Sequence, residues 1–170
     1  SPLVFGSTNQ TTYFRASDGE HGYELWKTDG TSSGTFMLKD ILPGAKGSWP
    51  IGQVAGSRAF FNAYDDPSGE EYSGFPNNLW TSDGTEAGTA PITQAGIGLP
   101  LGNMTRLGKR VLFITPIPYL TLPPPDLWAT DGTESGTVRL FDGDVAGSLR
   151  VTGDTAFFCA TADPRNEPQR

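Results

Sequence analysis

The sequence predicts an all-β protein made of repeated four-stranded units, and three observations lead to this prediction. The segment Leu25–Thr35 returns with little change as Leu79–Thr89 and Leu127–Thr137, at intervals of about 50 residues. The 170 residues include 22 Gly and 14 Pro, and 11% are aromatic, which suits short strands joined by tight turns. No long stretch is rich in the helix formers Ala, Leu, Glu and Lys.

Each unit has the same expected order of elements. A short strand comes first, an aromatic strand follows, and a polar or acidic loop leads to a hairpin built on the repeated segment. The aromatic strands are 13–16, 59–63, 111–114 and 156–160. The Trp hairpin occurs three times, so the fourth unit is expected to be partial. A single repeat domain with units of approximately 1–47, 48–98, 99–146 and 147–170 is therefore predicted.

The repeated hairpin turns on an Asp-Gly-Thr triplet. Gly accepts positive φ, and the Asp carboxylate can bind backbone amides one or two residues on. Thr35, Thr89 and Thr137 are expected to begin the return strands, where a β-branched residue fits. The predicted turn residues are Asp29, Gly30, Thr31, Asp83, Gly84, Thr85, Asp131, Gly132 and Thr133.

Such a triplet could also bind calcium or serve in catalysis. Three equivalent copies in one chain favour a structural turn over either alternative.

Charge and composition exclude several classes of function. Twelve Lys and Arg against 19 Asp and Glu give a net charge of −7, so a phosphate backbone would be repelled and nucleic acid is not expected as a partner. No stretch approaches the ~20 apolar residues of a membrane span, and no signal peptide is visible, so a soluble chain is expected.

Neither the single cysteine nor the single histidine indicates a catalytic site. Cys159 lies in an apolar run, which predicts a small buried residue, and its distance in sequence from His21 argues against a Cys-His nucleophile. His21 lies between acidic and glycine residues, which is typical of a polar turn rather than of a zinc site.

Two further segments read as connectors between units. Leu42–Ser48 and Asp142–Ser148 both end in Gly-Ser and are rich in turn residues. The Pro-rich stretch 116–125 is interpreted as a loop insertion within the third unit.

These motifs resemble a bacterial repeat family whose signature is Glu-Leu-Trp-x-x-Asp-Gly-Thr-x-x-Gly-Thr. The first unit matches best, with Gly22–Trp26 followed by Lys39–Gly44, whereas Asn78 and Asp126 replace the Glu in the later units. The resemblance covers nearly the whole chain. It implies propeller-like β units and a secreted, cell-surface or periplasmic location, and it provides no catalytic residues to transfer.

Units of this length suit the blades of a β-propeller, whose rings usually hold four to eight blades. Three and a half units would not close such a ring and would leave unpaired edges. We therefore expect an incomplete ring that is completed by a protein partner, by further copies of the chain or by the rest of a longer protein. An open stack of hairpin sheets is the alternative fold.

Loops that depart from the repeat are the candidate binding sites. Asp65, Asp66, Glu70 and Glu71 form an acidic insertion that is a weak candidate for calcium, although a solvated loop is the simpler interpretation. Aromatic residues outside the repeated strands could form a binding surface or could cover sheet edges. These residues are Trp49, Tyr64, Tyr72, Phe75 and Tyr119.

Three hypotheses about function follow. The first is a non-enzymatic, extracytoplasmic propeller-type module that presents loops to a protein or glycan. The second is a carbohydrate-binding lectin that uses the loop aromatics. The third is a hydrolase, which would require at least two carboxylates that converge on one pocket. No cofactor is expected beyond the weak calcium candidate.

Overall fold

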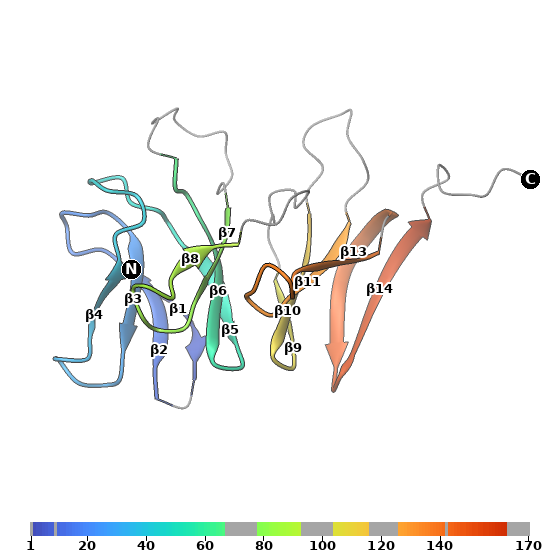
Figure 1. Ribbon diagram of the computed structural model, residues 1–170, viewed down its shortest axis with the longest axis horizontal. Coiled ribbons are helices and arrows are strands. Elements are labelled where there is room, and N and C mark those ends of the chain that lie inside the picture. Colours follow the sequence, from blue (N-terminus) through green and yellow to red (C-terminus); the bar gives the residue numbers. More distant parts are fainter. Residues whose placement is uncertain are drawn as a thin grey trace, which may run out of the picture. The chain divides into compact units, whose positions relative to one another are not determined.

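The computed structural model describes residues 2–8, 10–66, 78–92, 104–115, 126–141 and 143–162. All elements in these ranges are β-strands, which confirms the predicted all-β class (Figure 1). The strands form four small antiparallel sheets, and the chain divides into two compact units, Ser1–Thr93 and Gln94–Arg170. The described segments contain no helix that is long and apolar enough to cross a membrane.

The first compact unit holds two four-stranded sheets, each a meander in chain order. The strands of the first sheet are β1 (Leu3–Ser7), β2 (Thr12–Ala16), β3 (Glu24–Thr28) and β4 (Phe36–Lys39). Those of the second sheet are β5 (Ile51–Ala55), β6 (Arg58–Ala63), β7 (Asn78–Ser82) and β8 (Ala90–Pro91). Pro91 lies in an edge strand, where its missing N–H costs no ladder hydrogen bond.

The second compact unit holds one four-stranded and one two-stranded sheet. The third sheet consists of β9 (Thr105–Leu107), β10 (Arg110–Ile114), β11 (Leu127–Thr130) and β12 (Val138–Phe141). The fourth sheet consists of β13 (Gly143–Thr152) and β14 (Thr155–Ala162). The predicted three and a half units thus correspond to three complete meanders and one half.

The aromatic strand and the Trp strand pair in the same register in every complete sheet. Phe14 pairs with Trp26, Phe61 with Trp80 and Phe113 with Trp128. The ring centroids of these three pairs are 6.4, 6.3 and 6.5 Å apart. Aromatic pairs at this separation add to the stability of a sheet beyond the area they bury.

Glycine sets the hairpin between the first two strands of the later sheets. The paired residues that flank the turn are Ala55 and Arg58, Leu107 and Arg110, and Thr152 and Thr155. The first turn residue is Gly56, Gly108 or Gly153, with φ near +60° in each. A two-residue connection with Gly first is the type II′ turn that suits the twist of a hairpin.

Apolar side chains form a core within each compact unit. In the first unit, Phe5, Leu25, Val54 and Phe61 belong to one buried cluster that joins its two sheets. β1 also contacts β5. In the second unit, the cluster contains Leu112, Leu127, Ala129 and Val145, and β9 contacts β13.

Three expectations differ from the structure in detail. The return strands begin one residue after Thr35, Thr89 and Thr137, because each Thr hydroxyl donates a hydrogen bond back into the turn. The segment 143–148, expected as a connector, lies within β13, whose pairing shifts register between Ala146 and Arg150.

The third difference concerns the cysteine. Cys159 is exposed rather than buried. It lies on β14, which pairs with β13 alone among the described strands, so no third strand covers it.

Candidate functional site

The three Asp-Gly-Thr turns share one hydrogen-bond pattern. In the first, Oδ1 of Asp29 accepts bonds from the backbone N–H and the hydroxyl of Thr31, at 2.9 and 2.7 Å. The Thr31 hydroxyl accepts the N–H of Gly34 at 3.0 Å. The same contacts recur around Asp83 and Asp131.

The chemistry of these carboxylates follows from that pattern. The Thr hydroxyl and the Thr N–H stabilise the charged form, so the pKa of Asp29, Asp83 and Asp131 lies below its usual value. A Cβ on Gly34 would lie 2.0 Å from Oδ1 of Asp29, so the motif's second Gly leaves room for the carboxylate. Each Asp therefore acts as an internal acceptor that shapes its own turn.

The turn of the second sheet also packs against the first sheet. The ammonium group of Lys27 donates to the carbonyl oxygen of Gly84 at 2.7 Å. A Cβ on Gly84 would lie 2.8 Å from the hydroxyl of Tyr13. Burial raises the pKa of that Tyr13 hydroxyl, and the nearby Asp83 raises it further.

A buried carboxylate organises the connector after the first sheet. Glu24 is fully buried and accepts hydrogen bonds from the N–H groups of Ile41, Leu42 and Ser48 and from the Ser48 hydroxyl. Burial raises the pKa of the Glu24 carboxyl, and these donors oppose the rise. The Glu of the first repeat thus holds residues 41–48 against β3.

Asp126 has a related role in the third sheet. It precedes the Leu-Trp pair as Glu24 does, and its Oδ1 accepts the N–H of Gly143 at 3.3 Å. Its Oδ2 also lies 3.3 Å from the guanidinium of Arg139. The roles of Glu24 and Asp126 were not predicted from the sequence. The signal available was an acidic residue next to the apolar Leu-Trp pair, where a buried charge needs hydrogen-bond donors.

Two glycines allow that connector to approach the first sheet closely. Tyr23 forms a parallel bridge with Gly47. A Cβ on Gly22 would lie 2.5 Å from the backbone N of Gly47, and one on Gly47 would lie 2.3 Å from the backbone N of Tyr23. The backbone N–H of Trp49 donates to the Tyr23 carbonyl at 2.9 Å, which fixes Trp49 beside this contact.

Trp49 is the most distinctive of the predicted binding residues. Its φ of 50° is left-handed, a conformation that non-glycine residues rarely adopt, and 37% of its surface is exposed. Its ring lies 4.5 Å from that of Tyr23, and the guanidinium carbon of Arg15 lies 5.1 Å from its centre. Its indole N–H donates to the carbonyl of Lys46 at 3.0 Å.

These contacts give Trp49 a definite place in the molecule. A cation and a second aromatic ring hold the indole against the first sheet, while part of its surface faces solvent. Tyr64 is half-buried, and its N–H donates to the carbonyl of Ser48, the residue before Trp49. The backbone therefore brings two of the five predicted loop aromatics to one connector.

The remaining loop candidates are only partly described. Tyr72, Phe75, Tyr119, Glu70 and Glu71 lie outside the described residues. Asp65 accepts bonds from the Asn78 amide, at 2.9 and 2.8 Å, and from the Trp80 indole at 3.1 Å. Asp66 is exposed. No group of three or more metal-ligating side chains occurs in the ranges that the structure describes.

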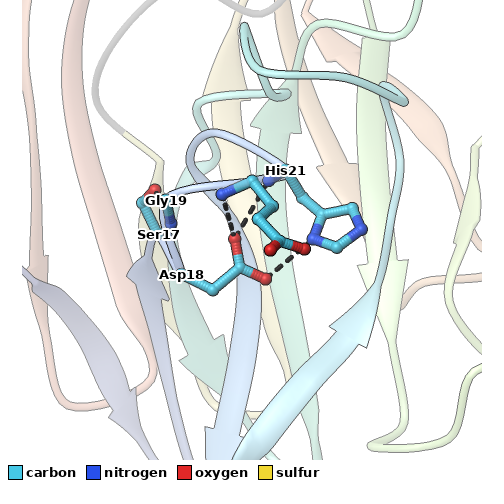
Figure 2. Close-up of polar contacts among 5 residues, drawn as sticks. Ser17, Asp18, Gly19 and His21 are labelled. Atoms are coloured by element: carbon cyan, nitrogen blue, oxygen red, sulfur yellow. Dashed lines mark hydrogen bonds and ion pairs between the residues drawn. The ribbon is translucent and has the colours of Figure 1, made fainter.

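His21 lies in a polar turn, as Figure 2 shows. Oδ1 of Asp18 accepts the N–H groups of Glu20 and His21, both at 2.9 Å, and Oδ2 lies 2.7 Å from Nδ1 of His21. The bonds from the two N–H groups lower the pKa of Asp18, and the bond to Asp18 raises the pKa of His21. The side chain of His21 thus forms a local ion pair with Asp18.

Among the described carboxylates, those of Asp29, Asp83 and Asp131 shape turns, that of Glu24 anchors a connector, and those of Asp18, Asp65 and Asp126 accept hydrogen bonds from neighbouring groups. The surface feature that stands out is the Trp49–Tyr23–Arg15 group on the connector after the first sheet. No family model, curated protein or solved structure matches the chain.

Proposed function

We propose that this chain is a non-enzymatic binding module of β-propeller type that assembles with another chain or with the rest of a longer protein. The observation that carries the proposal is the fourth sheet, which has two described strands where the other sheets have four. Phe157 and Phe158 on β14 are 59% and 37% exposed, whereas Phe60 and Phe61 on the matching strand β6 are fully buried. Successive residues of a strand point to opposite faces, and exposed phenylalanines on both faces of an edge strand are typical of a strand that another polypeptide flanks.

The propeller arrangement is part of the proposal. Within each compact unit, the first strands of consecutive sheets are in contact, β1 with β5 and β9 with β13. In a propeller, the first strand of each blade lies beside that of its neighbour around the central channel. Repeated meanders with this contact support blades more than an open stack of hairpins.

The proposed location is outside the cytoplasm, as a secreted, cell-surface or periplasmic protein. This part rests on the resemblance of the three hairpins to the Glu-Leu-Trp-x-x-Asp-Gly-Thr repeat family. Fractionation of the source cells with an antibody to the chain tests it, and recovery in the cytoplasmic fraction alone would refute it.

Native mass spectrometry beside denatured mass measurement tests assembly. A denatured mass of 18.2 kDa with a larger native mass supports completion by partner chains. A denatured mass well above 18.2 kDa supports completion by the rest of a longer protein. A native mass equal to a denatured mass of 18.2 kDa, at micromolar concentration and with no partner recovered, contradicts the proposal.

A carbohydrate-binding role is the second candidate, and the strained, partly exposed Trp49 favours it. Aromatic faces stack on sugar rings, and Arg15 and Tyr23 beside the indole could donate hydrogen bonds to hydroxyl groups. Trp49→Ala is expected to abolish signals on a glycan array, whereas Phe36→Ala, at an exposed aromatic residue elsewhere on the first sheet, should leave them unchanged. An array on which the unsubstituted chain gives no signal removes this candidate.

A further inference from the structure

The free edge of β14 is the part of the described structure that best indicates the chemistry of a partner. We propose that this edge pairs with a hairpin of the chain's own repeat type, Leu-Trp-x-x-Asp-Gly-Thr-x-x-Gly-Thr, that comes from outside the described residues and sets its Trp opposite Phe158. The inference deepens the proposed function, on which it rests, by naming the chemistry of the partner.

The register of the complete sheets identifies the pairing. Phe61 and Phe113 each lie three residues after the residue that closes the two-residue turn, and Phe158 lies at the same distance from Thr155. Phe61 pairs with Trp80 and Phe113 with Trp128. The same position on β14 has no Trp strand among the described residues, because β13 is its one neighbour there.

Burial supports the same correspondence. Phe61 and Phe113 are 0% and 1% exposed beneath their Trp partners, whereas Phe158 is 37% exposed. At the next position, Asn62 is 4% exposed and Ile114 is half-buried, whereas Cys159 is exposed. A third strand on β14 would therefore cover the same positions that it covers in the second and third sheets.

Phe158 already packs against the preceding sheet. Its ring makes an edge-on contact with Phe141 of β12, at a centroid distance of 5.7 Å. In the first compact unit, the ring of Phe61 stacks on that of Phe5 in β1 of the preceding sheet, at a centroid distance of 6.4 Å. Phe158 thus lies against the preceding sheet, as Phe61 does, and no described strand supplies its partner on the second edge of β14.

A second copy of this chain cannot supply the hairpin from its native fold. Its three Trp strands, β3, β7 and β11, are each paired on both edges within a complete sheet. The partner is therefore an additional repeat hairpin, whose backbone would extend the ladder and whose Trp would stack on Phe158.

Cys159 provides a built-in probe, since it is the chain's single cysteine and is exposed beside Phe158. For the test, a flexible linker and a copy of residues 17–39 are added to the C-terminus of the full chain. After the Cys159 thiol has been reduced, the rate at which a maleimide labels it is measured. Pairing should slow labelling at least about tenfold, because the thiol then reacts mainly when the strand opens. In an extended chain whose copied hairpin carries Ser in place of Trp, Cys159 should be labelled at the same rate as in the unextended chain.

Substitutions in β14 and β4 complete the test. In the extended chain, Phe158→Ser should restore fast labelling, whereas Phe36→Ser, at an exposed aromatic residue on a complete sheet, should keep it slow. Equal labelling rates for the Trp and Ser copies would overturn the inference.

The native mass separates this result from the proposed function. If the native chain is assembled but the Trp and Ser copies give equal labelling rates, the proposed binding module is retained and the repeat hairpin is refuted as its partner. A monomeric native chain with slow labelling in the Trp copy alone supports the pairing and contradicts assembly in the purified material.

Discussion

Glu24 shows how one side chain can organise a connector. Its carboxylate is fully buried and accepts four hydrogen bonds from Ile41, Leu42 and Ser48, with no basic partner among the contacts described. Glu24→Gln would turn an NH₂ group toward donors that need an acceptor. We expect a loss of about 1–3 kcal/mol in the free energy of unfolding, measured by urea denaturation. The exposed control Glu20→Gln should stay within about 0.5 kcal/mol, and equal effects of the two substitutions would contradict the assigned role.

The Asp18–His21 pair predicts a pH dependence of local stability. Since the folded pKa of His21 is raised above its ordinary value of 6.5, its stabilising effect is fully present below pH 6.5. That effect is lost as the pH rises through the folded pKa. Asp18→Asn should therefore return the His21 pKa toward 6.5, as followed by NMR titration of the imidazole. An unchanged His21 pKa in this variant would show that the ion pair has no such influence.

At the scale of the element, the Asp-Gly-Thr turn depends on a glycine that does not need positive φ. Gly34 is required for space, because a Cβ there would meet the Asp29 carboxylate at 2.0 Å. Gly34→Ala should displace the carboxylate and break its bonds to Thr31, and it should therefore lower the urea midpoint of unfolding. Ser32→Ala, at an exposed position of the same turn, is the control and should change little.

A double-mutant cycle separates this clash from other effects of Ala. In an Asp29→Ala background the obstacle is gone, so Gly34→Ala should cost clearly less than in the unsubstituted chain. Additive effects of the two substitutions would contradict the steric explanation.

The elements themselves could be predicted well from the sequence, because their signals are local. Asp-Gly marks a turn, and the aromatic residues of 59–63 and 111–114 mark strands whatever surrounds them. The role of Glu24 could not be predicted in this way, because its donors lie 17 to 24 residues later in the chain. The group of Trp49, Tyr23 and Arg15 likewise depends on a glycine contact between Gly22 and Gly47 that composition does not reveal.

At the scale of the whole molecule, one incorrect expectation is the most informative. The apolar run around Cys159 predicted burial, since apolar residues on a central strand are normally covered on both sides. The strand is formed, but its sheet stops at two strands, so the covering elements are absent from the described chain. Local sequence thus determined the strand, whereas burial depended on the number of strands in the sheet.

The incomplete sheet leads to a prediction about the state of the chain in solution. Phe157 and Phe158 expose large apolar area on adjacent positions of β14, and burying such area favours association by about 25 cal/mol for each Å². The double substitution Phe157→Ser and Phe158→Ser should therefore shift the native mass of an assembled 18.2 kDa chain toward the monomer. The matched control is Leu140→Ser with Val138→Ser, at exposed apolar residues of β12 in the complete third sheet, and it should preserve the assembly. Association that survives the β14 substitutions but is lost in the β12 control would place the interface on β12, and the half-built sheet would then have no part in assembly.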